Sequence, residues 1–128
     1  MPEPAPVGSI GWTDLTVPDA KKVNEFYKQV VGWQDEAVDV DDYQDFVIKD
    51  GSGEAIAGIC HAKGANAEMP PQWLMYIRVA NLDESIEKCQ SMGGKLVTQK
   101  RDMGGYGVMC VIQDPAGAVV ALIQPPAA

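Results

Sequence analysis

The sequence has few of the residues that build a disulfide framework, a histidine-rich metal centre or a membrane anchor. It contains three cysteines and one histidine, and none of the cysteines stands in a CxxC motif. An odd number of isolated cysteines is typical of reduced thiols, which predicts a cytoplasmic protein. No apolar run approaches the ~20 residues of a membrane span, and residues 1–7 lack the basic start and apolar stretch of a signal peptide.

Basic residues are also scarce. The chain has 10 lysines and arginines against 18 aspartates and glutamates, which gives a formal net charge of −8. An acidic surface repels phosphate backbones and anionic lipids, so neither nucleic acid nor a membrane is expected as a partner. What the chain does have is a hydrophobic content of 46% over 128 residues, enough for one globular domain with a real core.

Apolar spacing predicts one strand, one helix and three further strands between residues 9 and 62, after a flexible arm at residues 1–8. In the strand at residues 9–17, alternation places Thr13, Leu15 and Val17 on the face that would contact the helix. Asp19 is a natural helix N-cap, and Gly32 suits the left-handed residue that ends a helix. The expected helix stripe is Val23, Phe26, Tyr27 and Val30, and the later strands are 33–40, 43–49 and 54–61, joined at Asp41–Asp42 and 50–53.

The same order of elements is expected again between residues 72 and 125, after a linker at residues 63–71. Val79, Asn81 and Gly94 follow Val17, Asp19 and Gly32 by 62 residues each, so strand end, N-cap and helix stop recur at one spacing. An internal repeat of this kind predicts two similar modules in one domain. The expected elements are a strand at 73–79, a helix capped by Asn81 with Leu82, Ile86 and Cys89 as its stripe, and strands at 95–99, 106–113 and 118–124.

Short motifs mark both halves of the chain. The first half contains Leu15-Thr16-Val17-Pro18-Asp19, Phe26-Tyr27 and Gly32-Trp33, and the second contains Gly93-Gly94, Asp114-Pro115-Ala116-Gly117 and Leu122-Ile123-Gln124. In this order and spacing they resemble the vicinal oxygen chelate superfamily, which includes glyoxalase I, bleomycin-resistance proteins and extradiol dioxygenases. The resemblance implies an α+β fold of two βαβββ modules that form a curved, cup-shaped mixed sheet with helices on the outer face. It also implies a homodimer.

Catalytic members of that superfamily hold a divalent metal with His, Glu or Gln from the first and last strands of each module. By position, the matching residues are Trp12 and Leu74 in the first strands and Ala121 in the last strand of the second module. The match in the first module is Ile59, Gly58 or Ala57, depending on hairpin length. None of these side chains can ligate a metal, so we expect a metal-free member without a cofactor.

The strand face opposite the helices is the expected ligand-binding face, whereas Met75, Ile77 and Val79 join the helix-side core. Asp14 and Arg78 either form a structural salt bridge, or Arg78 clamps a ligand carboxylate or phosphate and Asp14 acts as a base. Trp12 offers a ring that could stack on a flat ligand. The predicted ligand-binding residues are Trp12, Thr16, Leu74, Tyr76, Arg78 and Ala121.

Five further side chains are candidates for the same site. His61, the only histidine, shares strand parity with Ile59 and is, with Asp14, a candidate catalytic residue; a structural role is the alternative. Tyr43, Trp73, Tyr106 and Met109 are either pocket walls or ordinary core.

The predicted function is the binding of a small organic molecule in the cup of the sheet, without the usual metal. One alternative is a lyase-, isomerase- or hydroxylase-type enzyme that uses Asp14, His61 or an exogenous metal. The other is an antibiotic-sequestering protein of the bleomycin-resistance type. With one histidine in no fitting context, a Ser-His-Asp triad is not recognisable.

Overall fold

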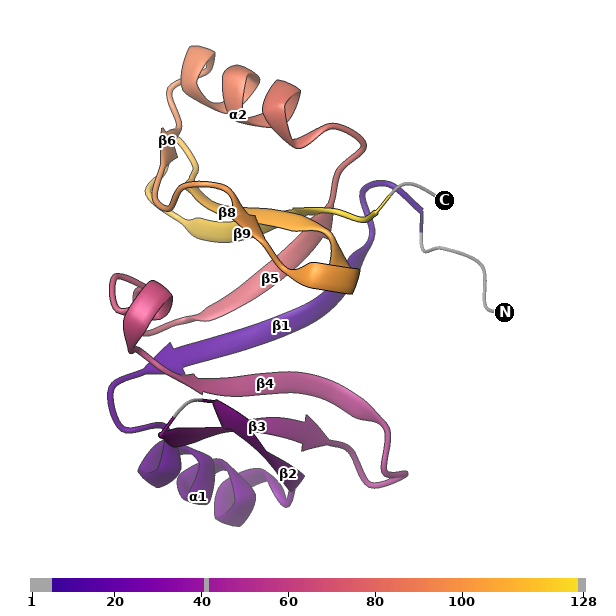
Figure 1. Ribbon diagram of the computed structural model, residues 1–128, viewed down its shortest axis with the longest axis vertical. Coiled ribbons are helices and arrows are strands. Elements are labelled where there is room, and N and C mark those ends of the chain that lie inside the picture. The colour runs from indigo at the N-terminus through magenta and orange to yellow at the C-terminus, as the bar shows by residue number, and fades with distance from the viewer. Residues whose placement is uncertain (1–5, 41, 127–128) are drawn as a thin grey trace. The chain divides into compact units, whose positions relative to one another are not determined.

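The computed structural model describes residues 6–40 and 42–126 and shows two compact units (Figure 1). The N-terminal unit is Trp12–Trp73, and the C-terminal unit contains the described residues up to Gly11 and from Leu74 onwards. Residues 1–5 of the expected arm, and Asp41 of the expected turn, lie outside the described residues. The boundaries 9–62, 63–71 and 72–125 stay predictions.

The N-terminal unit has the predicted order of strand, helix and three strands. Its elements are β1 (Ile10–Val17), α1 (Ala20–Val31), β2 (Gln34–Val40), β3 (Tyr43–Lys49) and β4 (Ala55–His61), followed by a single 3-10 turn, η1 (Gly64–Asn66). The strand order is β2-β3-β4-β1. β1 and β4 are parallel, while β3 is antiparallel to both of its neighbours.

Helix α1 begins and ends where its capping residues predict. The Asp19 carboxylate accepts a hydrogen bond from the Lys22 backbone N–H at 3.2 Å, and Gly32 ends the helix with a φ of 86°. Each cap satisfies a backbone group that the end of a helix leaves without a partner.

The buried face of α1 differs from the predicted stripe. Ala20 and Asn24 are its buried residues, whereas Phe26 and Val30 are 57% and 65% exposed, so half of the predicted stripe was wrong. The Asn24 amide donates a hydrogen bond to the Asp35 carboxylate on β2 at 2.6 Å. This polar contact turns the Asn24 side of the helix toward the sheet, which hydropathy alone does not predict.

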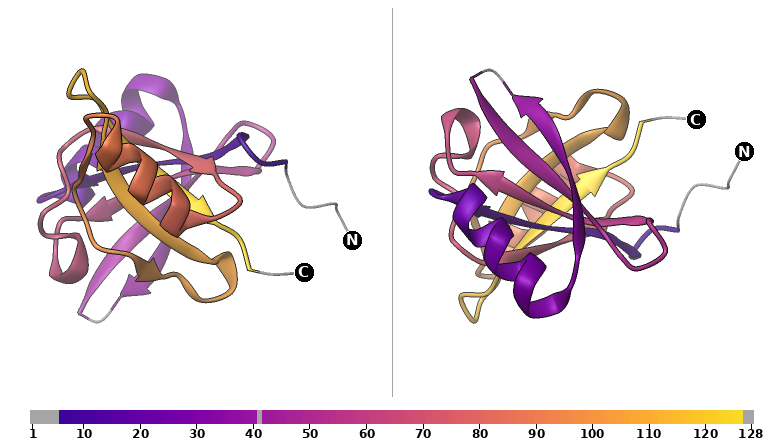
Figure 2. Two further views of the ribbon diagram at one scale, coloured as in Figure 1. Left: turned by 90° about the horizontal axis from the view of Figure 1, so that it is seen from above. Right: turned by 90° about the horizontal axis from the view of Figure 1, so that it is seen from below.

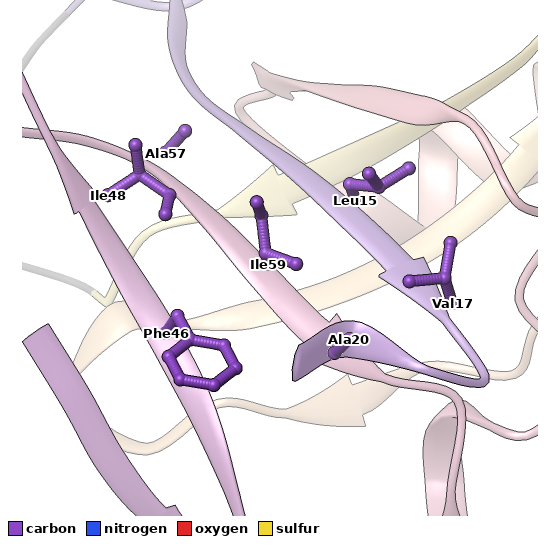
Figure 3. Packing of buried hydrophobic residues seen from close by; sticks show 7 residues of the cluster. All are labelled: Leu15, Val17, Ala20, Phe46, Ile48, Ala57 and Ile59. Carbon is purple, nitrogen blue, oxygen red and sulfur yellow. The ribbon is translucent and has the colours of Figure 1, made fainter. Parts of the chain in front are cut away.

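Strand alternation builds the core of the N-terminal unit, as predicted for Leu15 and Val17 (Figure 3). Tyr27 and Trp33 pack against it, and Trp73 joins them by donating its indole N–H to the Tyr27 hydroxyl at 3.0 Å. Trp73 is therefore a core residue of this unit. The buried cluster consists of Leu15, Val17, Ala20, Phe46, Ile48, Ala57 and Ile59.

The C-terminal unit repeats the plan with one broken strand. Its elements are β5 (Trp73–Arg78), α2 (Leu82–Ser91), β6 (Lys95–Leu96), β7 (Arg101–Asp102), η2 (Gly104–Tyr106), β8 (Val108–Gln113) and β9 (Val119–Gln124). The strand order is β5-β9-β8-β6, with β7 also pairing β8 and β5 parallel to β9. Figure 2 shows each helix lying across the strands of its own unit.

Two strand predictions in this unit were wrong in extent. The strand expected at 95–99 stops at Leu96, because the N–H groups of Val97 and Thr98 both donate to the Val111 carbonyl. The Thr98 hydroxyl accepts the Val111 N–H at 3.0 Å in place of a backbone partner. The strand expected from 106 begins at Val108, since residues 104–106 form the 3-10 turn η2.

Helix α2 packs on its sheet through Leu82, which lies in one cluster with Cys110 and Leu122. Asn81 caps the helix by accepting the Glu84 N–H at 3.1 Å, as predicted. Ile77 and Val79 contact this cluster, but Met75 is 43% exposed, so its predicted place in the core was wrong. The α+β class with two βαβββ modules is confirmed.

Two hairpin turns are each held by an aspartate side chain that accepts hydrogen bonds within its own turn. The Asp50 carboxylate accepts hydrogen bonds from the Ser52 hydroxyl, the Ser52 N–H and the Glu54 N–H, and these bonds, that of the hydroxyl first, lower the pKa of Asp50. Asp114 accepts from Ala116 and Ala118 in the same way. An aspartate that bonds backbone N–H groups within its own turn fixes the hairpin. Across residues 6–40 and 42–126, no helix is long and apolar enough to cross a membrane.

Candidate functional site

The strand registers identify which residue of the N-terminal unit matches Ala121. Asp14 pairs with Gly58 across β1 and β4, and Tyr76 pairs with Ala121 across β5 and β9. Asp14 and Tyr76 are 62 residues apart, at corresponding places of the repeat. Gly58 is therefore the counterpart of Ala121, which decides between the three positions that the sequence left open.

The four positions that correspond to metal ligands in catalytic members are thus Trp12, Gly58, Leu74 and Ala121. An indole, a glycine and two aliphatic side chains offer no lone pair suited to a divalent cation. Among the described residues, no group of three or more His, Cys, Asp or Glu side chains is placed to hold a metal ion. The residues present do not fit the metal that the resemblance would imply.

In the N-terminal unit, Trp12 and Asp14 form a fixed pair on the strand face opposite α1. The Trp12 indole N–H donates to the Asp14 carboxylate at 2.5 Å. The carboxylate lies against Gly58, where a Cβ atom would collide with it. Both side chains are half-buried, and Thr16 is buried beside them on the same strand. We call this arrangement the Trp12–Asp14 pair; it presents a flat ring next to a hydrogen-bonded carboxylate.

The corresponding face of the C-terminal unit is apolar and buried. Leu74, Tyr76 and Ala121 all have exposed fractions of 7% or less, and Met109 and Val111 are fully buried. These predicted ligand-binding residues offer almost no surface to a ligand in this structure. Tyr106, a candidate wall, is 78% exposed in the turn before β8.

Arg78 is held by the N-terminal segment. Its guanidinium lies against Gly11 and donates to the Ser9 hydroxyl at 3.1 Å. Its backbone N–H donates to the Ser9 carbonyl, and its carbonyl accepts from Gly8. Asp14 and Arg78 belong to different units, and the pairing predicted between them stays a prediction.

His61 is the last residue of β4 and stands three residues beyond Gly58, which pairs with Asp14. Its ring contacts Tyr43 and Asp45, which by alternation belong to the face of Asp14. The two candidate catalytic residues, Asp14 and His61, are therefore separated by three residues along paired strands.

The hollow at His61 has a volume of about 350 Å³ and is lined by Lys21, Tyr43, Gln44, Phe46 and His61. Asp45 holds the histidine: its carboxylate accepts the His61 backbone N–H at 2.8 Å and lies 3.4 Å from the ring Nδ1. The Tyr43 ring contacts the imidazole edge-on, with centroids 5.3 Å apart. Sequence analysis missed Asp45 and Lys21, although the β3–β4 hairpin pairing could have placed residues 44 and 45 near His61.

Cys110 is not a candidate nucleophile. It is fully buried in the cluster under α2, and burial, with a smaller contribution from Cys89, raises its pKa to about 11. The reactive form of a cysteine is the thiolate, so this side chain behaves as a small apolar residue.

Comparisons with known proteins point to one family. The family model described as Glyoxalase/Bleomycin resistance protein/Dioxygenase superfamily matches residues 9–122. "Putative glyoxylase CFP32" of Mycobacterium tuberculosis is 33% identical over 127 residues, which cover 91% of this chain and 46% of that protein. "Anthracycline biosynthesis protein DnrV" of Streptomyces peucetius is 25% identical, with 90% and 46% covered. The chain spans about half the length of these curated relatives.

Solved structures agree in fold. Methylmalonyl-CoA epimerase from Mycobacterium tuberculosis superimposes with a TM-score of 0.56 at 19% identity, covering 99% of this chain and 94% of that one. A hypothetical protein, BH1468 from Bacillus halodurans, gives a TM-score of 0.62 at 11% identity, covering 94% and 96%. Identities this low show a common fold and carry no statement about activity.

Proposed function

This chain belongs to the Glyoxalase/Bleomycin resistance protein/Dioxygenase superfamily, and on that premise we propose that it binds a small organic molecule without a metal held by its own side chains. The observation that carries the proposal is the chemistry of the four ligand positions, Trp12, Gly58, Leu74 and Ala121. Side chains without donor atoms would leave a divalent cation without protein ligands.

The Trp12–Asp14 pair is the proposed binding element. The hydrogen bond from the Trp12 indole N–H to the Asp14 carboxylate fixes the indole ring. Little conformational freedom is therefore lost when a flat ligand stacks on this ring. The adjacent carboxylate accepts hydrogen bonds and favours a cationic or donor-rich ligand, in keeping with a net charge of −8. One relative is named for anthracycline biosynthesis, and anthracyclines are flat aromatic molecules that carry an amine.

A lyase- or isomerase-type activity is the second candidate. It is favoured by the fixed Asp14 carboxylate, a group able to take a proton from a bound ligand, and by a relative named as a glyoxylase. Product formation from a bound metabolite separates this candidate from sequestration without turnover.

A homodimer and a reducing compartment such as the cytoplasm complete the proposal. Members of this superfamily commonly place their binding site between two modules, either within one chain or across a dimer, which supports the homodimer. All three cysteines are thiols, as expected where disulfides are reduced. Light scattering at micromolar concentration should give twice the mass of one chain, and the mass of a single chain would contradict the dimer.

Calorimetric titration with doxorubicin, a flat aromatic cation, tests the binding element. Trp12→Phe should weaken binding by about 5- to 100-fold, because stacking on an aromatic side chain is worth ~1–3 kcal/mol and a smaller ring also loses its hydrogen bond to Asp14. Trp33→Phe is the matched control, since Trp33 packs in the aromatic core with Tyr27 and Trp73. Equal affinity of the Trp12→Phe protein and the parent would refute the role of this ring.

A further inference from the structure

The N-terminal unit contains a hollow that the proposed function does not use. It is the space of about 350 Å³ lined by Lys21, Tyr43, Gln44, Phe46 and His61, called here the Lys21–His61 hollow. It lies where β3 begins and β4 ends, three residues along β4 from Gly58, against which the Asp14 carboxylate lies. Its volume falls at the lower end of the range of small-molecule sites, ~300–1,000 Å³, which suits a ligand of one ring.

Two lysines lie at this hollow together with the Asp45 carboxylate, which is held against His61, although the chain carries a net charge of −8. Lys21 lines it, and the Lys63 ammonium lies 4.9 Å from the centroid of the Tyr43 ring. Lys21 also stands in the first turn of α1, which contains no acidic residue. The Asp19 carboxylate already caps this helix end, so a bound anion would act on the Lys21 ammonium.

The remaining walls combine two aromatic rings with polar side chains. Tyr43 is half-buried, so an apolar ligand body would meet its ring, whereas Phe46 is 9% exposed and offers little surface. His61 keeps its Nδ1 toward Asp45, at 3.4 Å, which leaves Nε2 on the other side of the ring. The Gln44 amide also lines the hollow, and its nitrogen donates to the Asp39 carboxylate at 3.0 Å.

We propose that the Lys21–His61 hollow binds a small aromatic carboxylate. The carboxylate pairs with the Lys21 ammonium, and the ring packs against Tyr43. This site recognises an anion, whereas the Trp12–Asp14 pair recognises a flat cation, so one unit carries two sites of opposite preference.

The single histidine makes the test direct, because its imidazole C–H signals in an NMR spectrum belong to His61 alone. Titration with benzoate should shift these signals in a saturable way, with a Kd of about 1 mM or tighter. Benzamide has the same shape without the charge and should cause at most a tenth of the benzoate shift at equal concentration. Inorganic phosphate, which has charge but no ring, should bind at least fivefold more weakly than benzoate.

Two lysines in one helical turn give a matched pair of variants. Lys21→Gln should weaken benzoate binding at least fivefold, whereas Lys22→Gln, which removes a charge that does not line the hollow, should leave it within twofold. Trp12→Phe should also leave benzoate binding unchanged, which separates this site from the proposed function. The proposal is overturned by an absent or non-saturable shift, by equal responses to benzoate and to benzamide or phosphate, or by equal effects of the two lysine variants.

Discussion

The two units share one order of elements but differ in what their sheets present opposite the helix. In the N-terminal unit this face carries the Trp12–Asp14 pair over Gly58. In the C-terminal unit the same strand positions carry Leu74 and Tyr76, with Ala121 in place of Gly58, and all three are buried. A repeated backbone therefore serves one polar surface and one apolar, closely packed surface.

The comparison shows how one glycine decides the chemistry of a sheet. Gly58 leaves room for the Asp14 carboxylate directly above the neighbouring strand. In the C-terminal unit the corresponding pair is Tyr76 and Ala121. In the N-terminal unit, the place of the Asp14 carboxylate thus depends on the missing Cβ atom of Gly58 on the adjacent strand.

The largest effect is expected from removing apolar volume on the buried face. Leu74→Ala should destabilise the protein by about 2–5 kcal/mol, because a fully buried leucine is replaced and a cavity remains. Met75→Ala is the adjacent control, and with a side chain 43% exposed it should change the free energy of unfolding by about 0.5 kcal/mol or less. Urea denaturation of both variants measures this, and similar costs would mean that the face is not closely packed.

The second prediction is a pH dependence of stability that comes from the core of the C-terminal unit and not from the core of the N-terminal unit. Cys110 pairs with Leu122 as Phe46 pairs with Ile59, so the C-terminal core has a titratable thiol where the other core has a phenyl ring. The pKa of Cys110 is raised from 9.0 to about 11, which means that the folded state holds this proton more tightly than the unfolded state. The contribution of this protonated thiol to the free energy of unfolding is therefore complete below pH 9 and is lost as the pH rises through about 11.

Above about pH 11, the loss in the free energy of unfolding should reach about 2–3 kcal/mol, since each pKa unit corresponds to ~1.4 kcal/mol. The free energy of unfolding, measured between pH 8 and pH 11.5, should fall more steeply for the parent protein than for Cys110→Ala. Cys110→Ala is expected to be less stable at pH 8 because the substitution leaves a cavity, but its free energy of unfolding should change less with pH. Parallel curves for the two proteins would show that the thiol does not titrate in this way.

A smaller effect concerns the glycine beneath the carboxylate. Gly58→Ala should cost about 1–3 kcal/mol, because the new methyl group would displace the Asp14 side chain in a close-packed setting. Combining it with Asp14→Ser should recover part of this cost, so the two changes are not additive. Gly51→Ala, at a position where no described atom comes within 4 Å of the added methyl group, is the control. Strict additivity of the Gly58 and Asp14 changes would contradict the contact.

Local chemistry explains which parts of the fold were predictable from the sequence. Asp19, Gly32 and Asn81 act on backbone groups within a few residues of themselves, and their caps lie where expected. Strand alternation likewise placed Leu15 and Val17 in the core. Two other features depend on contacts between residues distant in sequence. The hydrogen bond of Asn24 with Asp35 decides which side of α1 is exposed, and that of Thr98 with Val111 accompanies the end of the strand after Leu96.

The candidate site was predictable in part for the same reason. The resemblance gave the positions Trp12, Leu74 and Ala121, and the strand register was needed to select Gly58. His61 was a candidate because it is the single histidine, but its place beside Tyr43 and Asp45 depends on the pairing of β3 with β4. The buried state of Leu74 and Tyr76 depends on tertiary packing, which a strand pattern does not contain.

The most direct test of the central claim is calorimetric titration of the chelator-dialysed protein with doxorubicin, with its metal content measured by mass spectrometry. We expect the dialysed protein, with far less than one equivalent of zinc, nickel, iron or manganese, to bind doxorubicin with the affinity of the untreated protein. A stoichiometric metal that resists dialysis, or binding that disappears with the metal and returns on its addition, would contradict this claim.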